Sequence, residues 1–180
     1  MIPLGVIGLV TILAYTDHIT RNPILCLIAP GLGFGPCMVM GTSYILSGSY
    51  TWTAFVSSLI PFFLVSNLLL LNQFPDVDAD RTIGRNHIPI LKGRQSAAML
   101  YGFLLAGAYG SILIGFATGV IPPAGLAGLG TVVIAIPAVR GVIRHADDIP
   151  KLVPYMARNV LITIVTPVLL AAGMLWDATW

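Results

Sequence analysis

Charged residues are scarce in this chain of 180 residues. Only 9% of its residues are Asp, Glu, Lys or Arg, whereas 57% are hydrophobic. Soluble globular domains carry about 25% charged residues, so this composition excludes a soluble domain of ordinary make-up. The mean hydropathy of +0.92 agrees with that exclusion. We therefore predict an integral membrane protein, an all-α helical bundle that forms a single domain over residues 1–180.

Long stretches of the chain hold no charge at all. A spanning helix needs about 20 apolar residues, so the two longest uncharged stretches, 22–75 and 95–139, can each hold a helical hairpin. Turn signals divide the chain further into six expected transmembrane helices. These are Met1–Tyr15, Ile24–Leu46, Trp52–Phe74, Ser96–Ala117, Pro122–Ile143 and Val160–Trp176.

Cysteine is also rare, and no secretory signal is evident. Cys26 and Cys37 fall in one expected helix, and eleven residues of helix separate them by roughly 16 Å. That distance excludes a disulfide between them, so both are expected to be small buried residues. The first residues carry no positive charge, which is not typical of a signal peptide.

The charges that are present lie on alternate loops. All nine Lys and Arg residues fall in or beside the first, third and fifth loops between the expected helices. Alternate loops share one side of a membrane, and loops rich in Lys and Arg stay cytoplasmic. We therefore expect a protein of the cell (inner) membrane, with these loops in the cytoplasm and both termini outside. No basic patch indicates nucleic acid as a partner.

The acidic residues need a separate explanation, because acids contribute little to membrane orientation. Asp76, Asp78 and Asp80 directly follow the longest uncharged stretch. Carboxylates at a bilayer edge repel one another unless a cation binds between them. Asn72, Asp76 and Asp80 are spaced i, i+4, i+8, so a continuing helix would place them on one face, with Asp78 about 200° round from Asp76. Pro75 could introduce a kink here.

Oxygen ligands without Cys or His suit a hard cation such as Mg²⁺. Magnesium keeps several waters and uses one or two protein carboxylates together with substrate phosphates. Because Arg81 and Arg85 follow the acids closely, the segment is typical of a metal–diphosphate site. The residues alone also allow a solvated loop in which acids and bases pair locally.

Three other features have ordinary structural interpretations. His18, His87 and His145 are scattered, which is typical of interfacial histidines and not of a metal site. The glycines between Gly31 and Pro36 lie inside an apolar helix, where close helix packing and a kink are expected instead of a nucleotide loop. Asp147 and Asp148 precede the last helix, where capping or solvation is at least as good an explanation as catalysis.

The acidic segment resembles the second aspartate-rich motif of the UbiA superfamily of intramembrane prenyltransferases, and within it the menaquinone-type and related polyprenyl transferases. The Tyr15-Thr pair, the Gly/Pro-rich helix and Thr166-Pro167 in the last helix are similar to the later two thirds of such enzymes. The residues that carry the motif are Asn72, Asp76, Asp80, Arg81, Gly84, Arg85 and the Lys92-Gly93 turn.

The resemblance implies a nine-helix bundle whose active site opens near the cytoplasmic face. Two aspartate-rich motifs there hold Mg²⁺ ions that bind the diphosphate of a polyprenyl donor. Loss of diphosphate gives an allylic cation, which an aromatic, lipid or other electron-rich acceptor attacks, as in quinone biosynthesis. By resemblance, the Mg²⁺ and diphosphate ligands are Asn72, Asp76 and Asp80. Further substrate contacts come from Arg81, Arg85, Arg21 and Tyr15.

The chain departs from the family pattern in one respect. No second Asn/Asp-x-x-x-Asp-x-x-x-Asp pattern occurs, and Asp17 is the only acid before Asn72. We expect the chain to match the last six helices of nine, as a truncated gene model, a split gene or a shortened protein would. A non-catalytic remnant or partner subunit is therefore an alternative. An ion or proton transporter fits less well, because its acids would follow a path through the membrane.

Overall fold

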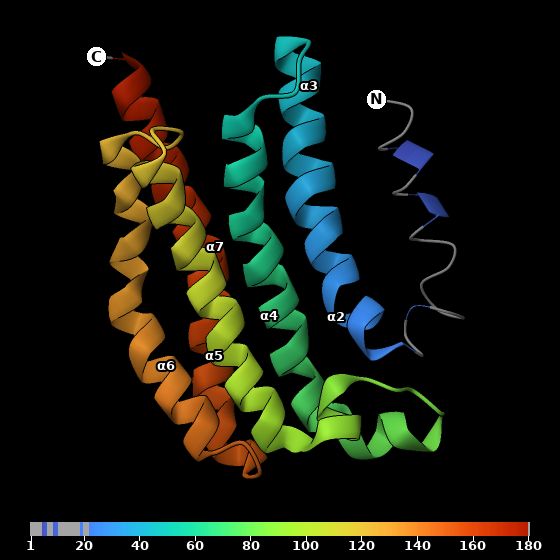
Figure 1. Cartoon of the computed structure of the whole chain (residues 1–180). Coiled ribbons are helices and arrows are strands. Elements are labelled where there is room, and N and C mark those ends of the chain that lie inside the picture. Colours follow the sequence, from blue (N-terminus) through green and yellow to red (C-terminus); the bar gives the residue numbers. More distant parts are fainter. Residues whose placement is uncertain (1–4, 7–8, 11–18, 20–21, 180) are drawn as a thin grey trace.

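The computed structural model describes residues 5–6, 9–10, 19 and 22–179, and in this part of the chain the regular structure is helical, with no strand (Figure 1). Five of its helices are long and apolar enough to cross a membrane. The predicted all-α membrane bundle is therefore confirmed. The expected helix Met1–Tyr15 lies mostly outside the described residues, so the described part of the chain tests only the other five expected spans.

The first described span is built from three consecutive helical segments, and the other spans follow in hairpins. The elements are α2 (Pro23–Leu32), the π-helix η2 (Gly33–Met40), α3 (Gly41–Ser47), α4 (Trp52–Thr82), α5 (Ile88–Ala117), the 3₁₀ helix η3 (Pro123–Thr131), α6 (Val132–Arg144) and α7 (Ile149–Thr179). Helix α4 lies centrally and packs on α5, on α2 with η2, and on α7 (Figure 1).

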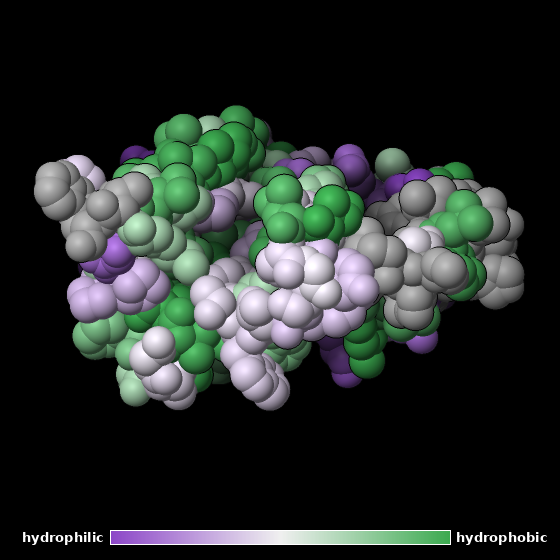
Figure 2. Space-filling view, turned by 90° about the horizontal axis from the view of Figure 1, so that it is seen from above, coloured by the Kyte–Doolittle hydropathy of each residue, from purple (hydrophilic) through white to green (hydrophobic). Residues whose placement is uncertain are grey.

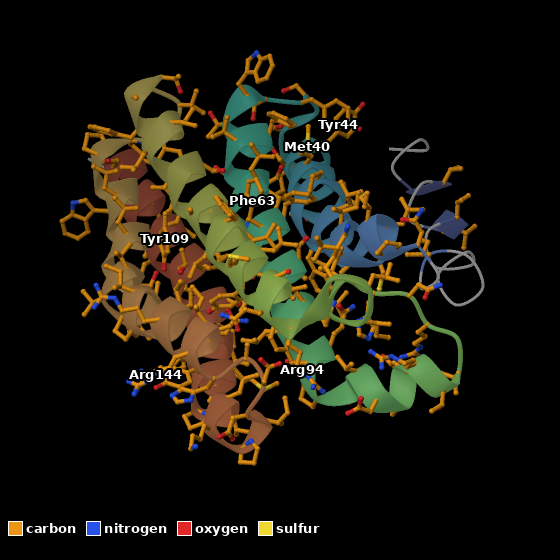
Figure 3. The ribbon with its side chains drawn as sticks, turned by 60° about the horizontal axis from the view of Figure 1, so that its bottom comes forward. Met40, Tyr44, Phe63, Arg94, Tyr109 and Arg144 are labelled. Carbon is orange, nitrogen blue, oxygen red and sulfur yellow. The ribbon has the colours of Figure 1, made fainter. Side chains whose placement is uncertain are left out.

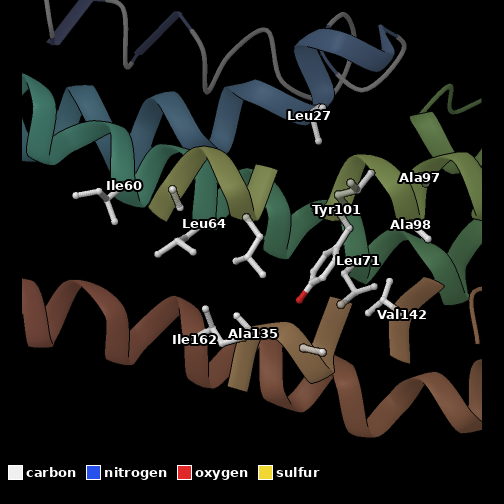
Figure 4. Close-up of a cluster of buried hydrophobic side chains, with 14 of the residues drawn as sticks. Leu27, Ile60, Leu64, Leu71, Ala97, Ala98, Tyr101, Ala135, Val142 and Ile162 are labelled. Atoms are coloured by element: carbon white, nitrogen blue, oxygen red, sulfur yellow. The ribbon is translucent and has the colours of Figure 1, made fainter. Parts of the chain in front are cut away.

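The core lies between α4, α5, α6 and α7. Ile60, Leu64 and Leu71 of α4 are fully buried, as are Tyr101 of α5 and Ile162 of α7 (Figure 4). Many large apolar side chains elsewhere are exposed, as expected for surfaces that face lipid. Seen from above in Figure 2, apolar residues cover much of the surface, and a group of weakly polar residues lies near the middle of this end.

The first described span approaches α4 through two glycines one turn apart. A Cβ atom on Gly31 would overlap Ser66 and the Phe62 carbonyl oxygen, and one on Gly35 would lie 2.5 Å from the Ser58 carbonyl oxygen. Only glycine permits backbones to approach so closely. The expected close helix packing is confirmed, and the chain widens into the π-helix η2 at this contact.

Several helix boundaries differ from the prediction. Helix α4 continues eight residues beyond the expected end at Phe74, because Pro75 removes only one backbone donor and the helix proceeds through it. Helix α5 begins at Ile88 and not at Ser96, with a break at Gly93 (φ 82°, ψ 158°). Helix α7 begins eleven residues before the expected Val160. The charged residues at these ends had indicated loops, but they lie on helical turns.

Candidate functional site

A cavity of about 120 Å³ lies beside the end of α4 that carries the acidic segment. Because α4 continues through Asp80, residues at i, i+4 and i+8 line one face of it. Four predicted site residues, Asn72, Asp76, Asp80 and Arg85, meet in this cavity. Its remaining lining residues are Cys26, Leu69, Gln73 and His87.

The turn that ends α4 places Arg85 beside Asp80. Gly84 adopts a left-handed conformation with φ 75°, its N–H donates to the Arg81 carbonyl (3.3 Å), and the Arg85 N–H donates to the Asp80 carbonyl (3.1 Å). This pair of hydrogen bonds is a Schellman motif, which favours glycine at the left-handed position. The motif therefore fixes the Arg85 backbone next to the Asp80 backbone.

The Asp80 carboxylate has a cationic or hydrogen-bonding partner at each oxygen. Arg85 Nη1 donates to Oδ1 at 3.0 Å, and His87 Nε2 lies 3.2 Å from Oδ2. Asp80 is only 8% exposed, and a buried carboxylate is costly unless such partners compensate for lost hydration. Asp80 is therefore a carboxylate whose loss of hydration is offset by a partner at each oxygen.

His87 is a site residue that sequence reasoning missed. The sequence indicated only an interfacial histidine here, whereas the structure shows that His87 is 2% exposed and contacts Asp80. Burial lowers the pKa of His87, although Asp80 opposes that shift, so the neutral imidazole with its proton on Nε2 fits the contact. The seven-residue offset from Asp80 crosses the Schellman turn, so no helical periodicity could reveal the pair.

Arg94 connects the start of the long part of α5 to the end of α4. Its Nε donates to the Phe74 carbonyl oxygen at 3.1 Å, and its Nη2 lies 3.5 Å from Asp78 Oδ2. Asp78 is 83% exposed and does not line the cavity. Figure 3 shows Arg94 at the same end of the bundle as Arg144. Arg94 therefore holds the acidic end of α4 from outside the cavity.

The opposite wall of the cavity comes from α2. Gln73 Nε2 lies 3.3 Å from Cys26 Sγ, which joins α4 to the first turn of α2. Cys26 is buried as expected, whereas Cys37 is only half-buried. At the start of α2, the Asn22 side chain accepts hydrogen bonds from the N–H groups of Ile24 and Leu25, which fixes where this wall begins.

The remaining sequence-predicted residues lie elsewhere. Arg81 is exposed and is not among the cavity-lining residues. Arg21 and Tyr15 lie outside the described residues. Asp148 caps α7, as one interpretation predicted: it accepts the Lys151 N–H (3.3 Å), and Lys151 Nζ lies 2.7 Å from its other oxygen. These contacts, the side-chain contact with Lys151 first, lower the pKa of Asp148.

The side chains that line the cavity suit a magnesium ion that keeps positions for water and substrate better than one that protein ligands enclose completely. Within the described residues, no three Asp, Glu, His or Cys side chains gather closely enough to hold a metal ion. The cavity instead offers two carboxylates and the Asn72 amide, with room for water. Magnesium typically takes one or two carboxylates and completes its shell with waters and substrate phosphates. The residues present fit that arrangement.

The fold and the site define an intramembrane helical protein with a carboxylate–amide–guanidinium cavity at one end of its bundle. The model of the UbiA prenyltransferase family matches residues 1–161, and the chain belongs to this family. Family membership supports prenyl transfer as the general activity. No curated protein and no solved structure matches the chain.

Proposed function

We propose that the protein transfers a polyprenyl group from a polyprenyl diphosphate to an aromatic or other electron-rich acceptor, in quinone-type biosynthesis. The observation that carries the proposal is that Asn72, Asp76 and Asp80 share one cavity with Arg85. Carboxylate, amide and guanidinium groups together suit a metal-bound diphosphate. The family to which the chain belongs supplies the reaction class.

Five of the residues that line the cavity have a role in this proposal. Asn72, Asp76 and Asp80 would hold Mg²⁺, which when bound stabilises the negative charge that develops on the leaving diphosphate. Arg85 adds a guanidinium to the same wall, and His87 orients Asp80. Arg81, which lies outside the cavity lining, is a weaker candidate for phosphate contact.

Apolar side chains beside the cavity would protect an allylic cation from capture by water. Leu70, Leu71 and Phe74 lie on α4 between the acidic residues and the membrane interior, and all three are fully buried. Their apolar packing excludes water from the core next to the cavity. We therefore propose that the donor's diphosphate lies at the polar end and its polyprenyl chain extends toward apolar surface.

Two matched aspartate variants test the proposed function. The purified protein, in nanodiscs with Mg²⁺, is given a polyprenyl diphosphate and a panel of aromatic acceptors, and both diphosphate release and prenylated product are measured. Asp76→Asn is expected to lower the rate by about 10²-fold, because a charge that supports the leaving group is lost. Asp78→Asn removes the same charge two residues away, outside the cavity, and is expected to retain most activity. Equal rates for Asp76→Asn and the unmodified protein would contradict the assignment.

The alternative is a non-catalytic membrane remnant or partner subunit. It is favoured by the occurrence of only one Asn/Asp-x-x-x-Asp-x-x-x-Asp pattern in the sequence. This alternative predicts that the purified chain binds Mn²⁺ and diphosphate at Asp76 but forms no prenylated product. Product formation by the purified chain alone excludes it.

A further inference from the structure

Both oxygens of Asp80 are already engaged within the protein. Arg85 holds Oδ1 at 3.0 Å and His87 holds Oδ2 at 3.2 Å. These two contacts use about half of the roughly four lone-pair sites of the carboxylate, and a cation on the remaining sites is repelled by the positive Arg85 guanidinium beside them. A cation that binds Asp80 must therefore replace one of these two partners or share its oxygen.

Arg85 and His87 differ in how readily each can move away from the Asp80 carboxylate. The His87 side chain is 2% exposed, and the residue is the N-cap of α5, where its carbonyl oxygen accepts hydrogen bonds from the N–H groups of Ile90 and Leu91. The Arg85 side chain is 48% exposed. Moving His87 would disturb a helix start and a buried contact, whereas the Arg85 guanidinium can turn into water at low cost.

The Arg85 backbone keeps its guanidinium near the cavity even when the ion pair opens. Its N–H is held by the Asp80 carbonyl oxygen within the Schellman motif, and Arg85 lines the same cavity as Asn72 and Asp76. A guanidinium binds phosphate oxygens in a bidentate fork at least as well as it binds a carboxylate. Arg85 thus has a second partner available wherever a diphosphate enters this cavity.

We propose that Arg85 is an exchangeable counter-ion. It neutralises Asp80 while no metal is bound, leaves Oδ1 when a divalent cation binds there, and then contacts the diphosphate, while His87 stays on Oδ2. Arg85 therefore competes with the cation and cooperates with the anion. This inference rests on the proposed function and adds an order of events to it.

Opposite effects on the two ligands distinguish this exchange from a purely structural role. Binding of Mn²⁺ alone, followed by electron paramagnetic resonance on the whole chain in nanodiscs, is expected to tighten by about 1.5- to 5-fold in Arg85→Gln, because the competing ion pair is lost. Binding of inorganic diphosphate in the presence of Mn²⁺ is expected to weaken by about tenfold in the same variant. A misfolded site would weaken both.

Arg81→Gln is the matched control, because it removes the same charge from an exposed position four residues earlier, outside the cavity lining. Its Mn²⁺ affinity is expected to rise less than that of Arg85→Gln. Arg85→Lys keeps a positive charge, so its Mn²⁺ affinity is expected to be closer to that of the unmodified protein than to that of Arg85→Gln. Equal Mn²⁺ affinities for Arg85→Gln and Arg81→Gln would overturn the exchange.

The outcomes also separate this inference from the proposed function. Mn²⁺ binding that depends on Asp76 but is not strengthened by Arg85→Gln overturns the exchange and leaves the metal site intact. Absence of any Asp76-dependent Mn²⁺ binding, with or without diphosphate, overturns both. Weaker Mn²⁺ binding in Arg85→Gln would show that Arg85 supports the metal site and would also overturn the exchange.

Discussion

At the scale of single residues, the contact between His87 and Asp80 is the feature with the clearest energetic consequence. A hydrogen bond to a buried charged group stabilises a protein by about 1.5–3 kcal/mol, and its loss leaves the charge short of one partner. His87→Ala is therefore expected to lower the free energy of unfolding by about 1–3 kcal/mol. Unfolding of the protein in detergent, followed by circular dichroism, measures this change.

A double-mutant cycle shows whether the His87 effect passes through Asp80. In an Asp80→Asn background the charge is absent, so His87→Ala is expected to cost less than in the unmodified protein. His145→Ala is a suitable comparison, because His145 stacks on Tyr155 with ring centroids 5.8 Å apart and does not line the cavity. Additive effects of the Asp80 and His87 changes would contradict a direct contact.

Residue spacing predicted part of this site and could not predict the rest. Asn72, Asp76 and Asp80 lie on one continuous helix, so their positions follow from helical periodicity alone. His87 comes after a turn, and its burial depends on how the segment folds back on α4. Periodicity carries no information across a turn, which is why His87 was interpreted as an interfacial residue.

At the scale of elements, the left-handed turn at Gly84 determines where α4 ends. A side chain at φ 75° costs about 1–2 kcal/mol, because its Cβ crowds the following carbonyl oxygen. Gly84→Ala is therefore expected to destabilise the protein by about this amount and to loosen the Arg85–Asp80 pair. Gly84→Asn should cost less, because Asn tolerates the left-handed conformation better than Ala does.

Stability alone does not identify the turn as the cause, so the Gly84 series needs a second measurement. Thermal unfolding is expected to give melting temperatures that rise from Gly84→Ala to Gly84→Asn to the unmodified protein. Mn²⁺ binding is measured as well, because it reports on the Arg85–Asp80 pair. Gly110→Ala is a matched control, because Gly110 lies inside α5 with no positive φ and no atom within 4 Å of an added Cβ. Ala at a helix interior is favoured over Gly, so that variant should be at least as stable as the unmodified protein.

Helix existence was predictable from the sequence, whereas helix ends were not. Uncharged stretches located the five described spans because burial in lipid requires them. The same reasoning placed boundaries where charge resumes, and it failed at Asp76, Lys92 and Lys151. All three lie on helical turns that extend beyond the apolar stretch, where polar side chains face water while the backbone stays helical.

At the scale of the whole molecule, the basic residues predict which end of the bundle faces the cytoplasm. The α4–α5 and α6–α7 connections lie at the same end, and the connection from α3 to α4 lies at the other (Figure 1). Arg94 and Arg144 mark the first of these ends (Figure 3). Because short loops rich in Lys and Arg stay inside, we expect the candidate cavity to open toward the cytoplasm.

Single cysteines on opposite connections test this orientation. In a background with Cys26→Ala and Cys37→Ala, Asn86→Cys lies in the exposed segment between α4 and α5, and Ser49→Cys lies between α3 and α4. A membrane-impermeant maleimide added to intact cells should label the Ser49→Cys variant only. Inside-out vesicles should give the reverse pattern, because each connection then faces the other solution. Labelling of Asn86→Cys in intact cells would place the cavity outside and contradict a polyprenyl diphosphate supplied from the cytoplasm.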